Sequence, residues 1–420
     1  MNLKLRLIIM NFLQFAVWGA YLTSMGSYLA SAGQGAHIGA FYAMQGITSI
    51  FMPALIGIVA DRWIPAQKMM GICHFISSSF LLGMAYYAMQ AGTDVNFGIL
   101  IGLFTVGIGF YMPSLSLSYS VAYNALEKAG MDTITAFPPI RIFGTIGFIC
   151  TMLLVDVLGY HTTYMQIVVS GVLGILLGFF SMTLPECPIN KASKKTMVDA
   201  LGLRAFSLFK DRTMATFFIF SMLLGVALQL SNSYANPFIT SFQDIPEFAN
   251  TFGANHANAL ISLSQCSETL CILLIPFFMK SLGIKKVMLL AMLAWVFRFG
   301  LFGAGNPGSG VWMFILSMIV YGVAFDFFNV SGSLFVNQFT DKSMRSSAQG
   351  LFMLMTNGIG ATFGTLAAQN IVNYFTENVE GKMIGDWSSV WYIFAAYSLV
   401  IAILFAIFFK YDFKPQKKEA

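Results

Sequence analysis

The stretch VWMFILSMIVYGVAFDFFNVSGSLFV, residues 311–336, decides the class of fold. Every residue in it is uncharged except the carboxylate of Asp326. An α-helix rises about 1.5 Å per residue, so about 20 apolar residues cross a hydrocarbon core of about 30 Å. We therefore predict a membrane-spanning helix here, and its single buried acid requires an explanation.

The rest of the chain repeats this apolar pattern. Of its 420 residues, 57% are hydrophobic and only 10% are charged, too few for the surface of a soluble protein. Comparable apolar blocks occur at 7–30, 38–60, 69–90, 96–122, 137–157, 163–184, 213–236, 257–279, 287–304, 311–336, 346–372 and 389–409. These blocks predict an all-α integral membrane protein with twelve transmembrane helices.

The positions of the basic residues predict the orientation in the membrane. If the N-terminus is cytoplasmic and the spans alternate, every Lys and Arg except Lys382, Arg141 and Arg298 lies in a cytoplasmic loop or terminus. Cytoplasmic loops carry an excess of Lys and Arg in membrane proteins. We therefore expect both termini to be cytoplasmic.

A basic loop at about 185–212 divides the predicted spans into six and six. It contains Lys191, Lys194, Lys195, Arg204, Lys210 and Arg212. The predicted organisation is an N-terminal six-helix bundle at 1–184, this cytoplasmic linker, a C-terminal six-helix bundle at 213–410 and a cytoplasmic tail at 411–420. Within the linker, residues 196–210 suit either an amphipathic helix on the membrane surface or a solvated basic segment.

The loop after the second span carries a recognisable arrangement of charges. Its sequence GIVADRWIPAQK, residues 57–68, resembles the loop signature of the major facilitator superfamily. We interpret Gly57, Asp61, Arg62 and Lys68 as a conformational latch, because a carboxylate at a helix end can pair with cations and with the N-terminus of a neighbouring helix. The alternative is a charged flank that only marks the membrane boundary.

Four charged residues fall well inside predicted spans: Arg141, Glu268, Arg298 and Asp326. A charge at the bilayer centre costs at least about 2.5 kcal/mol on the insertion scale, so such residues usually have a function. The alternative is an arginine–carboxylate pair that ties helices together, and for Arg298 both interpretations stay open.

Polar and aromatic residues at helical spacing accompany these charges. Amide side chains both donate and accept hydrogen bonds, and aromatic rings offer flat surfaces for stacking. The pattern predicts a cavity for a neutral, ring-bearing polar ligand such as a nucleobase with its sugar; a hydrogen-bonded seam between helices is the alternative. The candidate site residues are Arg141, Thr145 and Phe148 on the fifth span, Gln229 and Asn232 on the seventh, Gln265 and Glu268 on the eighth, and Tyr321, Phe325 and Asp326 on the tenth.

The two acids suggest how transport is energised. Burial disfavours the charged form of a carboxylate, whereas a neighbouring arginine favours it. Asp326 or Glu268 is therefore predicted to take up a proton on one side of the membrane and release it on the other.

Several helices also carry a family signature. The segments FPPIRIFGTIGF (137–148), SLSQCSETL (262–270) and SMIVYGVAFDFFNVSGSLFV (317–336) resemble the nucleoside:proton symporter family, and the likeness runs nearly end to end. It implies proton-driven import of purine and pyrimidine nucleosides across the bacterial inner membrane by a multi-pass monomer with no cofactor or metal. All ten candidate residues match the family's substrate-binding positions, with Asp326 and Glu268 also coupling protons. Broad and xanthosine-preferring members share the pattern, so selectivity stays open.

Three other functions were weighed. The first is a sugar:proton symporter, because RIFGTIG (141–147) resembles the fifth helix of the lactose-type symporters. The acid, arginine and acid on the eighth, ninth and tenth spans also resemble the proton machinery of that family. An uncoupled nucleoside facilitator needs no proton carrier, and a membrane receptor would bind ligand without moving it. An enzyme is not expected, because GNPGSG (305–310) lacks the Lys-Ser or Lys-Thr of a phosphate-binding loop. Nucleic-acid binding is not expected either, because the basic residues lie where membrane topology places them.

Overall fold

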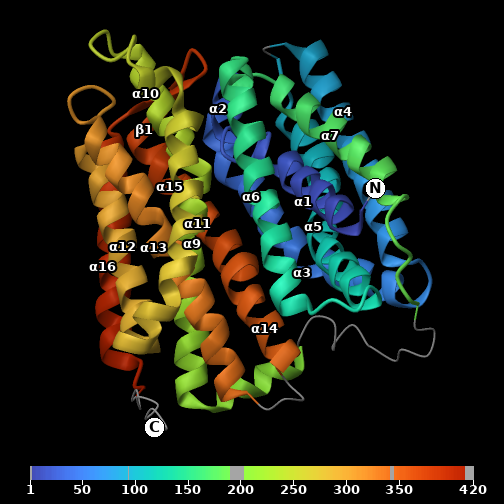
Figure 1. Ribbon diagram of the computed structural model, residues 1–420. Coiled ribbons are helices and arrows are strands. Elements are labelled where there is room, and N and C mark those ends of the chain that lie inside the picture. The colour runs from blue at the N-terminus through green and yellow to red at the C-terminus, as the bar shows by residue number, and fades with distance from the viewer. Residues whose placement is uncertain (1, 93, 190–202, 341–344, 412–420) are drawn as a thin grey trace.

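The computed structural model describes residues 2–92, 94–189, 203–340 and 345–411, and these are almost entirely helical (Figure 1). The helices of the first half are α1 (Leu3–Gly19), α2 (Met25–Ser31), η1 (Gly35–His37), α3 (Ile38–Arg62), α4 (Ala66–Ala91), α5 (Phe97–Lys128), α6 (Thr133–Val157), η2 (Tyr160–Thr162) and α7 (Met165–Ser181).

The second half begins with η3 (Leu203–Lys210) and ends with α16. Between them it contains one short β-hairpin and a π-helical segment, η5. Its elements after η3 are α9 (Arg212–Ser241), η4 (Phe242–Asp244), α10 (Phe252–Asn255), α11 (Ala257–Leu282), α12 (Ile284–Ala304), α13 (Val311–Phe339), α14 (Arg345–Met353), η5 (Leu354–Gly360), α15 (Ala361–Phe375), β1 (Thr376–Val379), β2 (Lys382–Gly385) and α16 (Trp387–Phe408).

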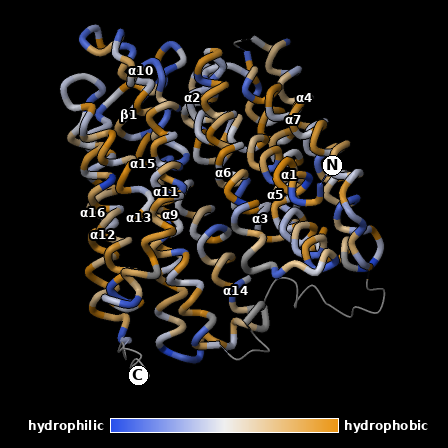
Figure 2. Tube along the Cα trace, viewed as in Figure 1, coloured by the Kyte–Doolittle hydropathy of each residue, from blue (hydrophilic) through white to orange (hydrophobic). Residues whose placement is uncertain are grey.

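The helices have the length and the apolar composition of membrane-spanning segments. Within the described residues, ten helices are long and apolar enough to cross a membrane, and α7 is a shorter apolar helix. Hydrophobic residues dominate the helices, and hydrophilic residues gather in the loops at their ends (Figure 2). Large apolar side chains such as Leu273, Phe277 and Phe363 are exposed, as expected of surfaces that face lipid rather than water. The prediction of an all-helical membrane protein is therefore confirmed, apart from the short hairpin.

Helices of each half pack mainly with one another. In the N-terminal half, α1 packs against α6 and α7, and α4 packs against α5 and α7. In the C-terminal half, α13 packs against α11 and α12, and α12 packs against α16. The halves meet where α3 contacts α15 and where α6 contacts α11. Figure 1 shows the two groups of helices side by side.

Glycines allow close helix contacts. A Cβ atom on Gly322 of α13 would lie 2.6 Å from Ser267 O of α11, and one on Gly26 of α2 would lie 2.6 Å from Ser233 O of α9. Small residues let backbones approach each other in membrane helices, where packing replaces the hydrophobic effect. The contact at Gly26 joins the two halves.

One end of the molecule, called here the hairpin end, carries α2, η2, α10 and the hairpin β1–β2 (Figure 1). There, Thr23 Oγ1 donates to Asn258 Oδ1 at 3.1 Å and Ser27 Oγ donates to Asn236 Oδ1 at 2.5 Å. His256 Nδ1 lies 2.9 Å from Asp156 Oδ2. Each of these contacts joins one half to the other, so together they close this end.

The hairpin adds a further connection between the halves. β1 and β2 pair antiparallel, with Thr376 opposite Gly385. From β1, Asn378 Nδ2 donates to Ala30 O of α2 at 3.0 Å. Lys382 of β2 forms an ion pair with Asp244 at 2.5 Å within the C-terminal half. The hairpin therefore spans from one half to the other across the closed end.

Several predicted boundaries change in detail. The first apolar block, 7–30, is two helices separated by a turn at residues 20–24. The block at 346–372 is α14, η5 and α15, and the π-helical η5 is a local widening that often marks functional sites. Of the proposed amphipathic segment at 196–210, residues 196–202 lie outside the described residues, and 203–210 form η3.

Candidate functional site

A large cavity lies between the two halves. Its volume is about 490 Å³. Side chains of α1, α3 and α5 line it from one half, and side chains of α9, α13, α14 and η5 line it from the other. Its polar and aromatic lining includes Trp18, Gln45, Tyr119, Gln229, Asn232, Phe325 and Asn357. A cavity of this size between helices, apolar with a few polar groups, is typical of a small-molecule site.

Three predicted residues line this cavity directly: Gln229, Asn232 and Phe325. Gln229 and Asn232 are one turn apart on α9, so their amides share a face. Gln229 Oε1 is buried and has no hydrogen-bond partner in the protein. A buried acceptor without a partner is costly, so a ligand donor at this point would be favoured.

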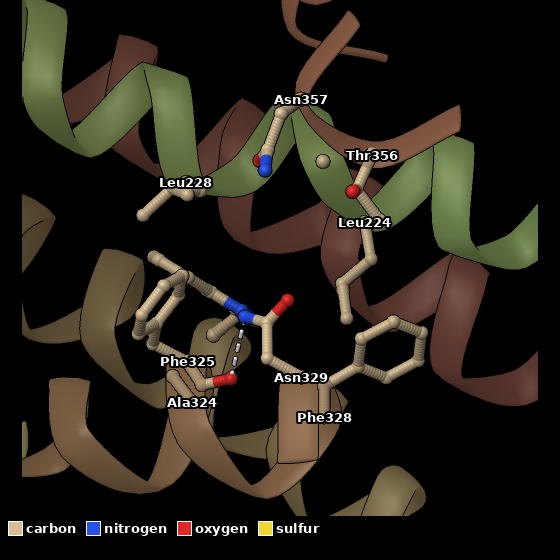
Figure 3. A pocket seen from close by; sticks show the side chains of 10 residues that line it. Leu224, Leu228, Ala324, Phe325, Phe328, Asn329, Thr356 and Asn357 are labelled. Atoms are coloured by element: carbon tan, nitrogen blue, oxygen red, sulfur yellow. Dashed lines mark hydrogen bonds between the residues drawn. The ribbon is translucent and has the colours of Figure 1, made fainter. Parts of the chain in front are cut away.

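A smaller pocket continues from the cavity along α9, α13 and η5 (Figure 3). Leu228, Phe325 and Asn357 line both spaces. Asn329 Nδ2 donates to the backbone oxygen of Phe325 at 2.9 Å (Figure 3). This bond leaves the Asn329 side chain beside the Phe325 ring, at the floor of the pocket.

Tyr321 and Phe325 form an aromatic pair on α13. Their rings lie 5.8 Å apart between centroids with an interplanar angle of 10°. Trp295 of α12 packs edge-on against Tyr321 at 5.9 Å. Because Phe325 lines the cavity, the pair presents a flat apolar surface to whatever enters it.

Arg141 lies on α6 near the cavity wall. Its Nε donates to Tyr119 Oη at 2.9 Å, and its guanidinium carbon lies 3.8 Å from the centroid of the Phe15 ring. Tyr119 lines the cavity, so Arg141 reaches the cavity lining through this hydroxyl. Thr145, one turn further along α6, is half-buried. Phe148 is buried and packs edge-on against Trp18, another lining residue, at 6.5 Å.

The two acids lie near each other between α11 and α13. Glu268 interacts electrostatically with Arg141 across the halves and with Asp326 in its own half. Asp326 is 4% exposed, and its Oδ2 has no hydrogen-bond partner in the protein. Burying a charged carboxylate oxygen without a hydrogen-bond partner is costly.

The alternative interpretation, an arginine–carboxylate pair that ties helices together, is not supported by the described residues. In the part of the chain that the structure describes, the ion pairs within 4.0 Å do not include Arg141, Arg298, Glu268 or Asp326. The interpretation of Arg298 as a member of such a pair is therefore wrong. Arg298 instead contacts serines of α9 and α11 and the Tyr321 ring.

Gln265 and Asn232 meet at a second, small cavity beside the main one. They line it together with Tyr321 and Arg298 from the same half and Thr23 from the other. Of the ten predicted residues, Gln229, Asn232, Gln265, Tyr321 and Phe325 thus line the two spaces. Arg141 and Phe148 adjoin the lining through neighbours, and Glu268 and Asp326 lie on helices that line these spaces. Thr145 lines neither of the two spaces.

Sequence reasoning missed several lining residues. The cavity is also lined by Trp18, Gln45, Tyr119 and Asn357. The helices that carry them show no charged residue accompanied by polar residues at helical spacing. A partial signal exists, because Gln45 and Ser49 are one turn apart on α3 and both face the cavity. Tyr119 gave no signal, since its place is set by the contact with Arg141.

The predicted latch is only partly described. Gly57 lies in α3 with open space around it, and Arg62 is the last residue of α3. Lys68 at the start of α4 pairs with Glu186 at 3.7 Å, and both side chains are well exposed. The side chain of Asp61 is not among those that the structure describes, so the latch stays a prediction.

Comparison with known proteins gives consistent matches along the whole chain. The family described as "Nucleoside H+ symporter" matches residues 1–414. Nucleoside permease NupG of Escherichia coli (strain K12) is 47% identical over 417 residues, which cover 98% of this chain and 97% of that protein. The xanthosine permease of the same organism is 43% identical over 421 residues, covering 99% and 98%. A crystal structure of a mutant of nucleoside transporter NupG superposes with a TM-score of 0.91 at 46% identity, covering 97% of this chain and 100% of that one.

Proposed function

Because the chain belongs to the nucleoside H+ symporter family, we propose that it imports nucleosides across the bacterial inner membrane together with protons. The observation that best supports this proposal is the cavity between the halves, where the unpartnered amide oxygen of Gln229 and an aromatic pair lie near the buried Asp326 and the partly buried Glu268. Amides suit the polar edge of a base or the hydroxyls of ribose, and parallel rings suit the face of a base.

We infer the following roles within the site. Gln229, Asn232 and Gln265 bind polar groups of the nucleoside, and Tyr321 and Phe325 stack on its base. Arg141, together with Thr145 and Phe148, shapes the opposite wall. Asp326, with Glu268 beside it, carries the proton.

We infer alternating access as the mechanism, with the two halves rocking as six-helix bundles in the major facilitator arrangement. The hydrogen bonds at the hairpin end support a state in which that end is closed. With both termini placed in the cytoplasm, as the basic residues favour, the hairpin end faces outward and the cavity is reached from inside.

Uptake in proteoliposomes tests the proposal. The purified protein is reconstituted, an inward proton gradient is imposed, and tritiated uridine, adenosine, xanthosine and lactose are compared. We expect uridine and adenosine to accumulate above equilibrium and lactose not to enter. Uptake of lactose alone would favour the sugar symporter, and uridine entry that never exceeds equilibrium would favour an uncoupled facilitator.

A further inference from the structure

Arg298 is a buried cation in the middle of α12, with only 1% of its surface exposed. Its guanidinium is satisfied by neutral groups. Nη2 and Nε donate to Ser231 Oγ of α9 at 2.7 and 3.1 Å, and Nη1 donates to Ser317 O of α13 at 2.8 Å. The planar fork therefore joins three helices and is fixed in its orientation.

The face of this fixed guanidinium lies against an aromatic ring of the proposed site. Its central carbon is 4.6 Å from the centroid of the Tyr321 ring. At this distance a cation is attracted to the ring face by about 0.5–2 kcal/mol. Phe302, on the same helix as Arg298, lies 5.0 Å from the same carbon but lines no described cavity of the site.

The orientation of the Tyr321 ring affects the cavity wall through its neighbour Phe325. Phe325 is parallel to Tyr321 within 10° and lines the main cavity. Tyr321 also lines the small cavity that Asn232, Gln265 and Arg298 share. A rotated Tyr321 ring would therefore disturb both the stacking surface and the space beside the two amides.

We propose that Arg298 is a positioning residue for nucleoside binding: it holds Tyr321, and through it Phe325, in the orientation that stacks on the base. The inference rests on the proposed function and deepens it. A residue with a purely structural role would affect affinity whether or not the Tyr321 ring is present. The effect of Arg298 on affinity instead requires the Tyr321 ring.

A double-mutant cycle on binding tests this pathway. Equilibrium affinity for tritiated uridine is measured on the full-length reconstituted protein for wild type, Arg298→Met, Tyr321→Leu and the double variant. Thermal unfolding is recorded for each. We expect Arg298→Met to weaken affinity about tenfold, equivalent to about 1.4 kcal/mol. In the Tyr321→Leu background the same change should have almost no further effect, because interacting residues are non-additive.

Two controls keep the outcome clear. Arg298→Lys retains the charge and a donor for Ser231, so it should fold and recover part of the affinity; it stands in for the Met variant if that one is unstable. Phe302→Leu removes the other ring beside the guanidinium and should leave affinity unchanged. Equal effects of Arg298→Met, or of Arg298→Lys, in both backgrounds would overturn the inference. Wild-type protein that binds no nucleoside would overturn the proposed function and this inference with it.

Discussion

At the scale of single residues, some side chains of the site line the cavity, and others contact the cavity lining only through a neighbouring side chain. Gln229 and Asn232 line the cavity directly, whereas Arg141 reaches it through the Tyr119 hydroxyl. Asp326 is buried between helices instead of lining the described cavity. Binding and proton transfer can therefore be separated by mutation.

The first prediction concerns Asp326. Replacing it with Asn keeps the size and removes the titratable group, so the proton can no longer be carried. We expect Asp326→Asn to lose uphill uridine accumulation while retaining counterflow, the exchange of internal for external nucleoside. Asp244→Asn, which removes an acid from the ion pair with Lys382, is the matched control and should accumulate normally. Normal accumulation by Asp326→Asn would exclude it as the carrier.

The second prediction concerns Arg141. Removing a charged hydrogen-bonding group typically costs about 1.5–3 kcal/mol, so Arg141→Ala should weaken uridine affinity by roughly 10- to 100-fold. Tyr119→Phe removes the hydroxyl that orients Arg141 from a residue that itself lines the cavity, and it should cost less, about threefold. Affinities from binding of tritiated uridine check both values. An unchanged affinity for Arg141→Ala would remove it from the site.

At the scale of elements, the contact of α2 with α9 controls how closely the halves approach at the hairpin end. Gly26 leaves no room for a side chain, because Ser233 O and Pro237 Cγ lie 2.6 Å from the position of an added Cβ. Asn236 on the same face of α9 accepts from Ser27. A glycine and a hydrogen bond thus work together to close this end.

The third prediction follows from that contact. Gly26→Val should hold the hairpin end apart and favour the state open there. We expect faster maleimide labelling of a cysteine placed at Thr162, which lines a pocket of about 130 Å³ at this end, with Cys150 and Cys266 replaced by Ser. Gly83→Val is the control, because nothing lies within 4 Å of a Cβ at Gly83. Equal labelling rates in the two variants would contradict this role for Gly26.

The sequence predicted the positions of the long helices better than the turns and strands that interrupt them. Apolar length predicted α13 and α16 well, because the bilayer dictates length whatever the neighbours are. It did not predict the turn at 20–24 or the hairpin at 376–385. Both depend on contacts with the other half, such as Thr23 with Asn258 and Asn378 with Ala30 O, and local sequence carries no record of them.

At the scale of the whole molecule, the site too could be predicted only in part, because some of its contacts join separate helices. Charge and helical spacing identified Gln229, Asn232 and Phe325 because a polar face in a membrane helix must meet something other than lipid. They did not reveal that no acid among the described residues pairs with Arg298, or that Tyr119 orients Arg141. Such pairings arise from the approach of separate helices, which a single sequence does not specify.

The central claim is that one cavity couples nucleoside entry to proton entry. The most direct test is proton movement caused by substrate alone, in liposomes with trapped pyranine and no imposed gradient. The account predicts that uridine added outside acidifies the interior for wild type and not for Asp326→Asn. Entry of tritiated uridine into wild-type liposomes with no change in internal pH would contradict it.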